Sequence, residues 1–426
     1  MVSKKYFIID FDSTFTQVEA LDELARISLQ DRADKEEIYK KIEDYTNQAM
    51  EGKLSFRESL AARVKLLEAD KSHLKLLVKH LKTLVSTSFA RNKNFFKQHA
   101  NEVLIVSGGF KEFIAPVVLP YHIKSENIYA NTFVFDKQGK IIGYDDTNPL
   151  SFEGGKVKLL KELKLPGEIH GIGDGYSDFQ LKESGMIKKF YAFTENVERK
   201  SVTERADHIT PSLDEVLFIN KIPAAISYPK NRIVCLVAGE NIPEASVKLL
   251  KKDGFSVKQV SELTKASIAE AGILLIGNKL TLTNELLSYA TKLKVIGTAE
   301  GAGLPVELCT AHGVAIFESG KKPESLGKRI AKYINNGDTI KSINFPHLQL
   351  PSVNGHRFIH IHQNVPGVLA KVNQVFADNQ LNITAQYLMT NSQIGYVITD
   401  ISGQYDKQML KTMKSIPHTI QLRFLY

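Results

Sequence analysis

The sequence predicts an α/β protein built from three successive parts. Short runs of strand-forming residues alternate with amphipathic helical segments over most of the 426 residues, which is typical of open parallel sheets covered by helices. The first part carries a long helix-rich insert after its first strand, at about 16–95. The last part changes to the order strand, helix, strand, strand, helix, strand, which is the ferredoxin-like plan.

Breaks in composition divide the chain further. A length of 426 residues exceeds what one hydrophobic core can serve, so we expect several domains. We place the first at 1–226, before a linker-like stretch that contains Pro and Asn. The strand–helix alternation restarts over 231–320, a polar connector occupies 321–352, and the ferredoxin-like part covers 353–426.

Composition excludes several classes of protein. The chain is 43% hydrophobic and 24% charged, and no apolar run approaches the roughly 18 residues that a membrane span needs. Its first apolar run ends at Asp10 and is too short for a secretory signal. Cys235 and Cys309 lack metal-ligand spacing and cannot make a disulfide framework. We therefore expect a cytoplasmic protein with no membrane partner.

The net charge of +8 does not indicate a nucleic-acid partner. Lysines are spread along helix-like segments such as 71–82 and 156–164, Trp is absent, and no basic cluster is interleaved with aromatic residues. Solvated helix faces around a site for an anionic metabolite explain this pattern better than a nucleic-acid surface.

Two carboxylates stand at the end of the first predicted strand. Asp10 and Asp12 are two residues apart, at the point of the sheet where α/β proteins bind ligands. One of them can attack phosphorus while the other transfers a proton. Alone, such a pair is more often an Asx turn or a helix cap.

Three further motifs follow in chain order and change that interpretation. A second strand ends in Ser107 and two glycines, whose hydroxyl and backbone N–H groups can form a nest for an anion. Lys156 follows a glycine pair and can neutralise a phosphoryl oxygen, although Lys158 could do so equally. A third strand ends in G-D-G-x-x-D, where Asp174 and Asp178 can serve a Mg²⁺ ion. Each motif has a simpler structural explanation by itself, but four in this order indicate one site.

In these motifs the sequence resembles the haloacid-dehalogenase superfamily over about residues 1–220, and phosphoserine phosphatases in particular. The resemblance implies a Rossmann-like core with a small helical cap. It also implies that Asp10 is the nucleophile that forms an aspartyl-phosphate. Asp12 would be the general acid for the leaving oxygen of serine and then the base for water.

The same resemblance assigns the groups that hold the phosphoryl group and the metal. The phosphoryl group would be bound by Ser107, the N–H of Gly108 and Lys156. Mg²⁺ would be bound by Asp10, the carbonyl of Asp12 and Asp174, with Asp178 in support. A metal there offsets the repulsion between an anionic nucleophile and an anionic substrate.

Within the insert, the stretches around Glu19 and Phe56 look like the cap of phosphoserine phosphatases. The resemblance implies that Glu19 and Arg63 bind the ammonium and carboxylate of the substrate, while Met50 and Phe56 form an apolar wall. A zwitterionic amino acid needs one fixed anion and one bidentate guanidinium, so the residue types fit. Alternatively, Arg63 is a surface helix residue and Glu19 a charge at a helix start.

The chain departs from that family at two positions. Many bacterial relatives have Ala and Asn where this sequence has Tyr176 and Ser177. A hydroxyl can replace one hydrogen bond of the amide, so we expect Ser177 to contact the substrate and activity to survive.

The middle part resembles a second enzyme family, D-3-phosphoglycerate dehydrogenase, with its centre missing. Residues 232–318 look like the first half of that family's substrate-binding domain, which implies a truncated flavodoxin-like module. No G-x-G-x-x-G follows a strand, and the glycine-rich loop at 297–303 has the wrong spacing. We therefore expect neither NAD binding nor dehydrogenase activity. The module is a spacer, an assembly platform or a vestigial ligand site.

The tail, 353–426, resembles the ACT regulatory domain of the same family. In that family L-serine binds at the interface of two side-by-side domains, at positions that are here His362, Asn364, Asn382 and Ile383. The alternative is that these are ordinary polar groups of turns and strands. The resemblance implies that L-serine is both product and effector, and symmetric pairing of the tails implies a homodimer or a larger assembly. Whether L-serine inhibits or activates stays open.

These observations favour a serine-regulated phosphoserine phosphatase, the enzyme of the last step of serine biosynthesis. A phosphatase of the same mechanism for another small phosphomonoester is one alternative, and the presence of Glu19 and Arg63 speaks against it. An inactive regulatory partner of the dehydrogenase is the other. The intact set of predicted catalytic residues speaks against that, namely Asp10, Asp12, Lys156 and Asp174.

Overall fold

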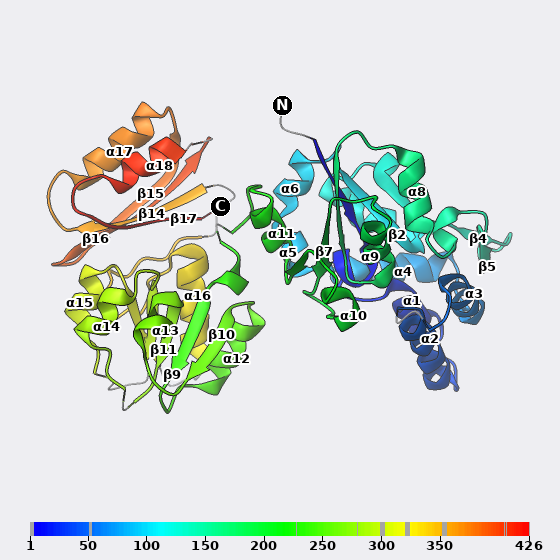
Figure 1. Ribbon diagram of the computed structural model, residues 1–426, viewed down its shortest axis with the longest axis horizontal. Helices are drawn as coiled ribbons and strands as arrows, with labels where there is room; N and C mark the ends of the chain where they lie inside the picture. The colour runs from blue at the N-terminus through cyan, green and yellow to red at the C-terminus, as the bar shows by residue number, and fades with distance from the viewer. Residues whose placement is uncertain are drawn as a thin grey trace. The chain divides into compact units, whose positions relative to one another are not determined.

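The computed structural model describes residues 4–50, 53–226, 228–278, 280–298, 303–319, 324–351, 356–403, 405 and 407–425. The chain folds as two compact units, Met1–Ala224 and Ala225–Tyr426 (Figure 1). Within the described ranges, no helix has the length and apolar character that crossing a membrane requires.

The first unit is built on a six-stranded parallel sheet with the order β3-β2-β1-β6-β7-β8. The strands are β1 (Lys5–Ile9), β2 (Val103–Phe110), β3 (Ile128–Asn131), β6 (Glu168–Gly173), β7 (Lys189–Phe193) and β8 (His208–Thr210). Counted along the chain, this is the strand order of the Rossmann fold, which confirms the predicted core. The order reverses between β1 and β6, and ligands bind at such a point of reversal.

Alternate residues of β1 are buried on opposite faces of this sheet. Phe7 and Ile9 belong to one hydrophobic core and Tyr6 and Ile8 to another. The helices of this unit are α1 (Ala20–Ser28), α2 (Lys35–Met50), α3 (Phe56–Leu66), α4 (Lys71–Leu81), α5 (Thr87–Arg91), α6 (Lys93–Gln98), α7 (Lys111–Val118), α8 (Gly155–Leu163), α9 (Tyr176–Glu183), α10 (Lys200–Thr203) and α11 (Leu213–Ile219). Helices α1–α6 fill the predicted insert.

Side-chain caps fix where two helices of the insert begin. Ser55 accepts a hydrogen bond from the backbone N–H of Glu58 at the start of α3. Asp70 accepts from the N–H groups of Ser72 and His73 at the start of α4, and the His73 ring lies 3.2 Å from the N–H of Asp70. Such caps satisfy N–H groups that have no partner inside the helix.

Shorter elements connect this framework. The hairpin β4 (Phe133–Phe135) and β5 (Ile141–Tyr144) packs against α3 through β5. A π-helical turn, η1 (Phe11–Phe15), follows β1 directly. The remaining short turns are 3₁₀ helices, namely η2 (Leu119–Tyr121), η3 (Ser125–Asn127), η4 (Pro149–Ser151) and η5 (Lys230–Arg232).

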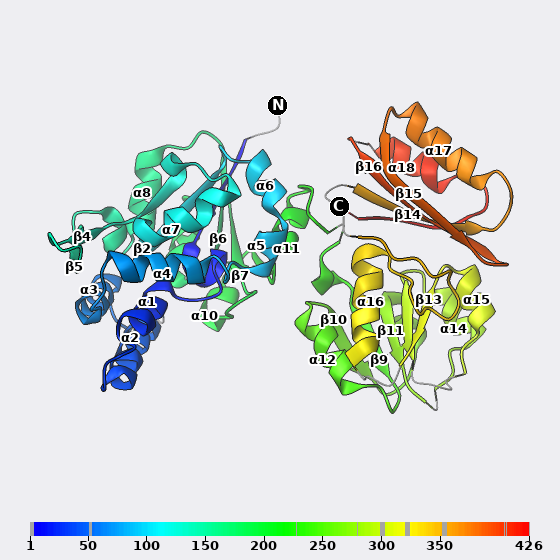
Figure 2. The same ribbon diagram turned by 180° about the vertical axis from the view of Figure 1, so that it is seen from behind.

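The second unit begins with a five-stranded parallel sheet of order β10-β9-β11-β12-β13. The strands are β9 (Val234–Ala238), β10 (Ser256–Val260), β11 (Ala271–Ile276), β12 (Val295–Thr298) and β13 (Ala315–Glu318). This is the flavodoxin-like order, as predicted. The helices of the module are α12 (Glu244–Lys252), α13 (Lys265–Glu270), α14 (Asn284–Tyr289), α15 (Val306–Ala311) and α16 (Glu324–Asn336), of which α16 crosses one face of the sheet (Figure 2).

The C-terminal part is a four-stranded antiparallel sheet of order β15-β16-β14-β17. Its strands are β14 (His356–Gln363), β15 (Asn382–Thr390), β16 (Ile394–Ser402) and β17 (Thr419–Leu425), with the helices α17 (Val368–Asp378) and α18 (Lys407–Lys414). Both helices pack on the same face. The predicted ferredoxin-like plan is confirmed.

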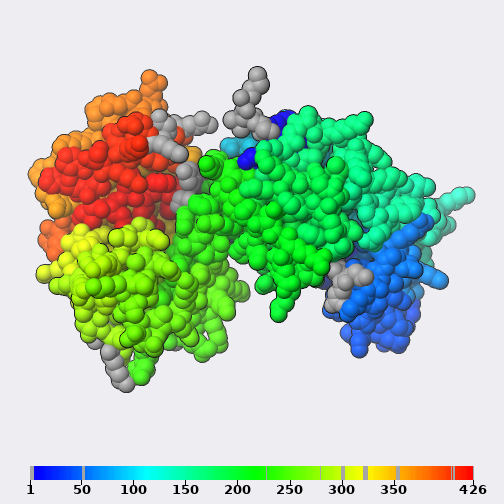
Figure 3. All heavy atoms as spheres, viewed as in Figure 1, coloured from blue at the N-terminus to red at the C-terminus, as the bar shows by residue number. Residues whose placement is uncertain are grey.

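The other face of the C-terminal sheet shares a core with the middle module. Ile359 and Tyr396 pack with Ile330 of α16 and with Phe345, which follows it. In Figure 3 the C-terminal part, in orange and red, lies directly against the yellow-green module. The segment predicted as a polar connector therefore contributes a helix and an aromatic side chain to this core.

Two arginines of the C-terminal sheet bind the last carbonyl groups of α16. Nη2 of Arg423 donates to the carbonyls of Tyr333 and Ile334 at 3.1 and 2.9 Å, and Nη1 of Arg357 donates to that of Asn336 at 3.0 Å. The carbonyl of Tyr333 also accepts the N–H of Gly337 at 2.9 Å, and a cation at a helix C-terminus is favourable. Arg357 is held in turn by Asp400, at 2.7 Å.

We expect Phe345→Ala to lower the free energy of unfolding of the second unit by about 3–5 kcal/mol, since truncating a buried Phe leaves a cavity. Ile343→Ala is the matched control, because Ile343 is 45% exposed; its effect should be below about 0.5 kcal/mol. Hydrogen exchange along a urea titration will measure both variants. Strands β9 and β14 should lose protection together, and loss in β14 alone would contradict a shared core.

Candidate active site

The four sequence motifs meet at the carboxyl edge of the first sheet. The register pairs Ile9 with Ile105 and with Ile172, so the residues that follow these three meet at one edge. Nζ of Lys156 lies 3.0 Å from Oδ1 of Asp10. The structure therefore joins chain segments that are more than a hundred residues apart in the sequence.

The turn after β1 orients the two predicted catalytic carboxylates. Oδ1 of Asp10 accepts the N–H of Phe11 at 2.8 Å, and Oδ1 of Asp12 accepts the N–H of Ala20, the first residue of α1, at 2.8 Å. Ser13 has φ 53°, in the left-handed region that non-glycine residues rarely occupy. Its hydroxyl donates to Oε1 of Glu19 at 2.7 Å. The strained turn therefore holds Asp10 in the sheet edge and ties Asp12 to the start of the cap.

Close packing explains the glycines after Ser107. A Cβ at Gly108 would lie 2.4 Å from Cζ of Phe56 in the cap, and a Cβ at Gly109 would lie 3.0 Å from Oδ2 of Asp12. The Ser107 hydroxyl accepts the N–H of Gly109 at 3.0 Å, which leaves its own hydrogen available to a ligand. The predicted anion nest is therefore covered directly by an aromatic side chain of the cap.

Close packing also explains the glycine pair before Lys156. Gly154 has φ +67°, and a Cβ at Gly155 would lie 2.0 Å from the carbonyl oxygen of Pro149. Helix α8 can therefore begin against η4 only with glycine at this position. Lys156 is buried, whereas Lys158 is exposed. Of the two lysines that the sequence left as alternatives, the structure brings Lys156 into the site.

Three buried aspartates form a cluster that can hold a metal ion. One oxygen from each of Asp10, Asp174 and Asp178 lies within 4.8 Å of the others. Asp178 also accepts from Nζ of Lys156 at 2.6 Å, and Oδ1 of Asp174 accepts from the Thr14 hydroxyl at 3.0 Å. Carboxylate oxygens are the ligands that a hard divalent cation prefers, so these residues fit one.

The pKa values in the cluster also indicate that it is suited to a cation. Burial and the charge of Asp10 raise the pKa of Asp178 to about 8, against the opposing effect of Lys156. Burial raises the pKa of Asp174 to about 7, although Arg199 lowers it. Burial lowers the pKa of Lys156, but Asp10 and Asp178 raise it more, so that its net direction is upward. The carboxylates therefore lack enough positive charge around them.

A count of charges also shows that negative charge exceeds positive charge at the site. Carboxylates exceed cations by three among the groups that line the cavity or pair with them, namely Asp10, Asp12, Glu19, Glu153, Asp174 and Asp178 against Arg63, Lys156 and Arg199. A divalent cation would offset most of this excess.

Asp12 differs from the metal cluster. Burial and the nearby carboxylate of Glu19 raise its pKa well above the usual range of an aspartate. A raised pKa favours the protonated form of a carboxyl group, which is the form that can donate a proton to a leaving group. The two carboxylates of the first motif therefore have environments suited to different roles.

Most of the predicted cap residues line the same cavity as the catalytic carboxylates. Glu19, Phe56 and Arg63 do so together with Asp10, Asp12, Ser107, Gly108, Lys156 and Ser177. Arg63 is buried, donates from Nη1 to the Thr46 hydroxyl at 3.1 Å, and has an Nε without a hydrogen-bond partner among the described residues. The alternative of a surface arginine is therefore wrong. The side chain of Met50 lies outside the described residues.

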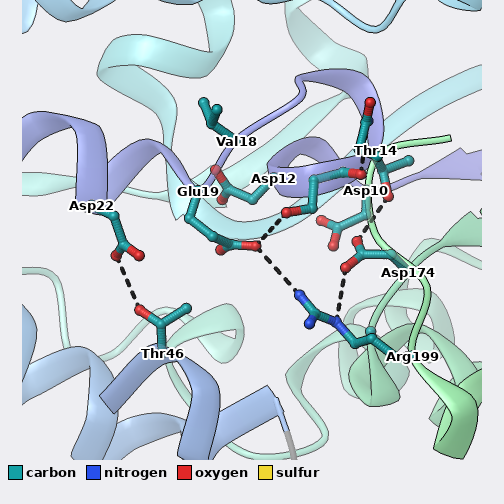
Figure 4. Close-up of polar contacts among 12 residues, drawn as sticks. Asp10, Asp12, Thr14, Val18, Glu19, Asp22, Thr46, Asp174 and Arg199 are labelled. Atoms are coloured by element: carbon teal, nitrogen blue, oxygen red, sulfur yellow. Dashed lines mark hydrogen bonds and ion pairs between the residues drawn. The ribbon is translucent and has the colours of Figure 1, made fainter. Parts of the chain in front are cut away.

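Sequence reasoning did not identify Arg199. Its Nε lies 3.1 Å from Oδ2 of Asp174 and its Nη2 3.8 Å from Oε1 of Glu19, so that it connects the metal cluster to the cap (Figure 4). It precedes α10, in a segment without a motif. The excess of carboxylates among the predicted site residues was the one signal that a further cation was needed.

The sequence motifs also did not predict a second contact between the cap and the core. Oε2 of Glu153 accepts the backbone N–H of Phe56 at 3.2 Å. Arg57 lies 4.3 Å from the ring centroid of Phe152. Both Phe152 and Glu153 line the cavity, beside the glycine pair of the lysine motif. Neither residue belongs to a motif, so only the folded chain reveals them.

The four predicted effector residues fall at opposite ends of the C-terminal sheet. Strands β14 and β15 both pair with β16, where Gln363 is opposite Ile394 while Asn382 is opposite Ser402. Asn364, which follows β14, is therefore about 25–30 Å from Asn382, since a strand rises about 3.4 Å per residue. Asn364 and Asn382 do not form one site within a single chain.

His362 and Ile383 belong to the same two ends. His362 is buried with its ring against Gly395, where a Cβ would lie 2.2 Å from Cε1, and its Nε2 has no hydrogen-bond partner among the described residues. Ile383, next to Asn382, is half-buried.

Comparison with known proteins places similarities in both halves. The phosphoserine phosphatase of Bos taurus is 31% identical over 219 residues, which is 49% of this chain and 89% of that protein. The chloroplastic phosphoserine phosphatase of Arabidopsis thaliana is 29% identical over 201 residues, or 46% and 65% of the two chains. A solved structure, a phosphoserine phosphohydrolase-like protein from Francisella tularensis, matches 51% of this chain and 99% of that one at 31% identity, with a TM-score of 0.47.

The other similarities concern the second unit. A family described as the AHAS small subunit-like ACT domain matches residues 358–421. D-3-phosphoglycerate dehydrogenase of Escherichia coli (strain K12) is 46% identical over 109 residues, which is 24% of this chain and 27% of that enzyme. The chain thus spans about a quarter of the length of these dehydrogenases. Both resemblances read from the sequence are confirmed.

We expect the cluster of Asp10, Asp174 and Asp178 to bind Mg²⁺ at least tenfold more tightly at pH 8 than at pH 6. The raised pKa values of Asp174, about 7, and of Asp178, about 8, leave both carboxyls mostly protonated at pH 6 and more ionised at pH 8, and a metal ligand must be ionised. Calorimetric titration in two buffers of different ionisation enthalpy will give the affinity and the protons released. An affinity that does not change with pH would contradict this assignment.

Proposed function

This chain belongs to the phosphoserine phosphatase family, and we propose that it hydrolyses O-phospho-L-serine to L-serine and phosphate through an aspartyl-phosphate. The observation that carries the proposal is one cavity lined by Asp10 and Asp12, by the nest at Ser107, and by Arg63 of the cap. It combines a nucleophile, an acid, an anion site and a guanidinium, which are the groups that this reaction needs.

In the first step, a carboxylate oxygen of Asp10 attacks phosphorus and the bond from phosphorus to the serine oxygen breaks. Lys156, 3.0 Å from Asp10, stays positively charged and can bind a phosphoryl oxygen as well. Ser107 and Gly108 line the cavity, and the free hydrogen of the Ser107 hydroxyl and the N–H of Gly108 are suited to bind the other oxygens. These groups orient the phosphoryl group for in-line attack.

Asp12 supplies and recovers the proton. Its raised pKa favours the protonated form, which can give its proton to the leaving serine oxygen. The resulting carboxylate then takes a proton from water as the water oxygen attacks phosphorus, which releases phosphate and restores Asp10. No other donor is needed for the two steps to balance.

A bound Mg²⁺ would neutralise charge between the carboxylates and the phosphoryl group. Asp10, Asp174 and Asp178 are the residues whose side chains would hold it. Asp178 is thus a candidate ligand in its own right, beside its contact with Lys156.

Arg63 and Glu19 support phosphoserine over other phosphomonoesters. The buried Arg63 has donors left over after its single hydrogen bond to Thr46, and a carboxylate of the substrate would satisfy them. Burial raises the pKa of Glu19, while the Ser13 hydroxyl lowers it; an arriving ammonium group would favour its ionised form. The two side chains thus match the two ends of a zwitterion.

We expect Arg63→Gln to lower kcat/KM for phosphoserine about a hundredfold, because one charge-assisted interaction with the substrate carboxylate is lost. The same variant should keep most of its activity on p-nitrophenyl phosphate, which has no such carboxylate. Phosphate release with Mg²⁺ measures both, with Asp10→Asn as the blank. Lys65→Gln, exposed on the same helix, is the matched control.

Two results would contradict the proposal. Absence of phosphate release from every ester by the unmodified chain would leave only the inactive regulatory partner. Equal losses on both substrates in Arg63→Gln would mean that Arg63 supports the fold of the cap and does not select phosphoserine.

The edges of the C-terminal sheet support regulation by L-serine. β15 is an edge strand, and its exposed side chains include Tyr387, Leu388 and Met389. An open strand edge with apolar side chains is suited to pairing with another strand. Two copies paired antiparallel along β15 would bring the Asn382 end of one copy to the Asn364 end of the other. Such a homodimer has two composite effector sites, one at each end.

The polar groups at these ends suit an amino acid. Asn364 donates its Nδ2 hydrogen to the carbonyl of Asn391 at 2.7 Å, which leaves its oxygen to accept from an ammonium group. Asn382 is exposed and can both donate and accept. L-Serine as effector and the homodimer are therefore one proposal, since neither half of the site is sufficient alone.

We expect complementation between two defective chains. Asn364→Ala and Asn382→Ala should each abolish L-serine binding as homodimers, whereas the mixed dimer should bind one L-serine, because one of its two ends keeps both asparagines. Calorimetry on chains that also carry Arg63→Gln removes the contribution of the active site, and Lys371→Ala, exposed on α17, is the control. Failure of the mixed dimer to bind would contradict a site shared between copies.

A further inference from the structure

A cleft lies in the second unit where β17 meets the middle module. Lys294 at the start of β12 and His312 after α15 line it from the module, while Lys414, Thr419 and Gln421 line it from the C-terminal part. Its volume is about 390 Å³, within the range of small-molecule sites. β17 is the opposite edge of the sheet from β15, so this cleft is distinct from the proposed L-serine site.

Positive charge in this cleft is not balanced. Lys294 and Lys414 line it, and Arg423 stands two residues beyond Gln421 on the same face of β17. Within the described ranges, no carboxylate lines the cleft and none forms an ion pair with these three cations. Burial and the charges of Arg423 and Lys414 lower the pKa of Lys294 to about 8. Arg423 is stabilised by the last carbonyl groups of α16, so the charges at the cleft that lack a counter-charge are those of Lys294 and Lys414.

Two buried polar atoms near these cations also lack partners. Oε1 of Gln421 and Nη1 of Arg423 have no hydrogen bond to any described residue. An unsatisfied buried polar atom destabilises the fold, and a ligand that reaches it would supply the missing hydrogen-bond partner. Gln421 would accept from a hydroxyl or amino group, while the cations would bind an anion.

We propose that this cleft binds a small phosphate-bearing metabolite that also carries a hydroxyl or amino group. A phosphate dianion matches several cations better than a single carboxylate does, and lysine is a common phosphate ligand. Lys294 comes from the module and Lys414 from the end of α18, so one bound phosphate would connect the two parts of the second unit. The function of the module is then ligand binding and not only spacing.

Competitive acetylation of lysines, read by mass spectrometry on the full chain, tests this directly. Inorganic phosphate at millimolar concentration should slow labelling of Lys294 and Lys414 at least fivefold. Lys292 and Lys411, exposed neighbours of each, should not change. Sodium chloride at the same ionic strength, and succinate, are the two comparison arms. In a Gln421→Leu variant, a phosphate ester with a hydroxyl group, glycerol phosphate, should protect less than it does in the unmodified chain.

Every other outcome overturns the proposal. Equal protection by sodium chloride means screening without a site. Protection by succinate but not by phosphate contradicts the phosphate assignment, and protection by neither contradicts an anion site. Acetylation is measured at Lys294 and Lys414 themselves, so phosphate bound at the active site does not affect the result.

Discussion

The ammonium group of Lys156 between Asp10 and Asp178 is the interaction on which the catalytic half depends. Three aspartates are buried together at the ends of parallel strands, where they repel one another. Lys156 offsets part of that repulsion from within 3.0 Å of two of them. Removing one partner of a buried charge pair costs about 3–5 kcal/mol. Helix α8 must therefore begin against η4, and Gly155 is needed because any Cβ would collide with Pro149.

Incomplete compensation of this charge is what makes the site functional. Three carboxylates remain in excess after Lys156, Arg63 and Arg199 are counted, so the site is suited to a divalent cation. The cap completes the site by contact with the core, since Phe56 covers Gly108 while Glu153 binds the backbone of the cap. The cap thus covers part of the cavity, and charge interactions are stronger where less water surrounds them.

The second unit depends on a different interaction, the binding of the last carbonyl groups of α16 by two arginines. Arg357 and Arg423 from two strands of the C-terminal sheet bind its last carbonyl groups, and this orients the sheet on the module. One edge strand, β17, is thereby brought beside the module, whereas β15 stays open. The two edges thus acquire different properties. One is available for pairing with a second copy, and the other borders the basic cleft.

The sequence by itself determined the strand–helix order, and with it the Rossmann, flavodoxin-like and ferredoxin-like parts. It also determined the strand-end residues Asp10, Ser107 and Asp174, because parallel strands of one sheet bring their carboxyl ends to the same edge. The local sequence pattern is enough to predict such features. Arg199, Glu153 and the choice of Lys156 over Lys158 were decided only by the tertiary structure, since they depend on which charges are buried beside which. The separation of Asn364 from Asn382 is of the same kind, because strand register fixes it and no motif encodes register.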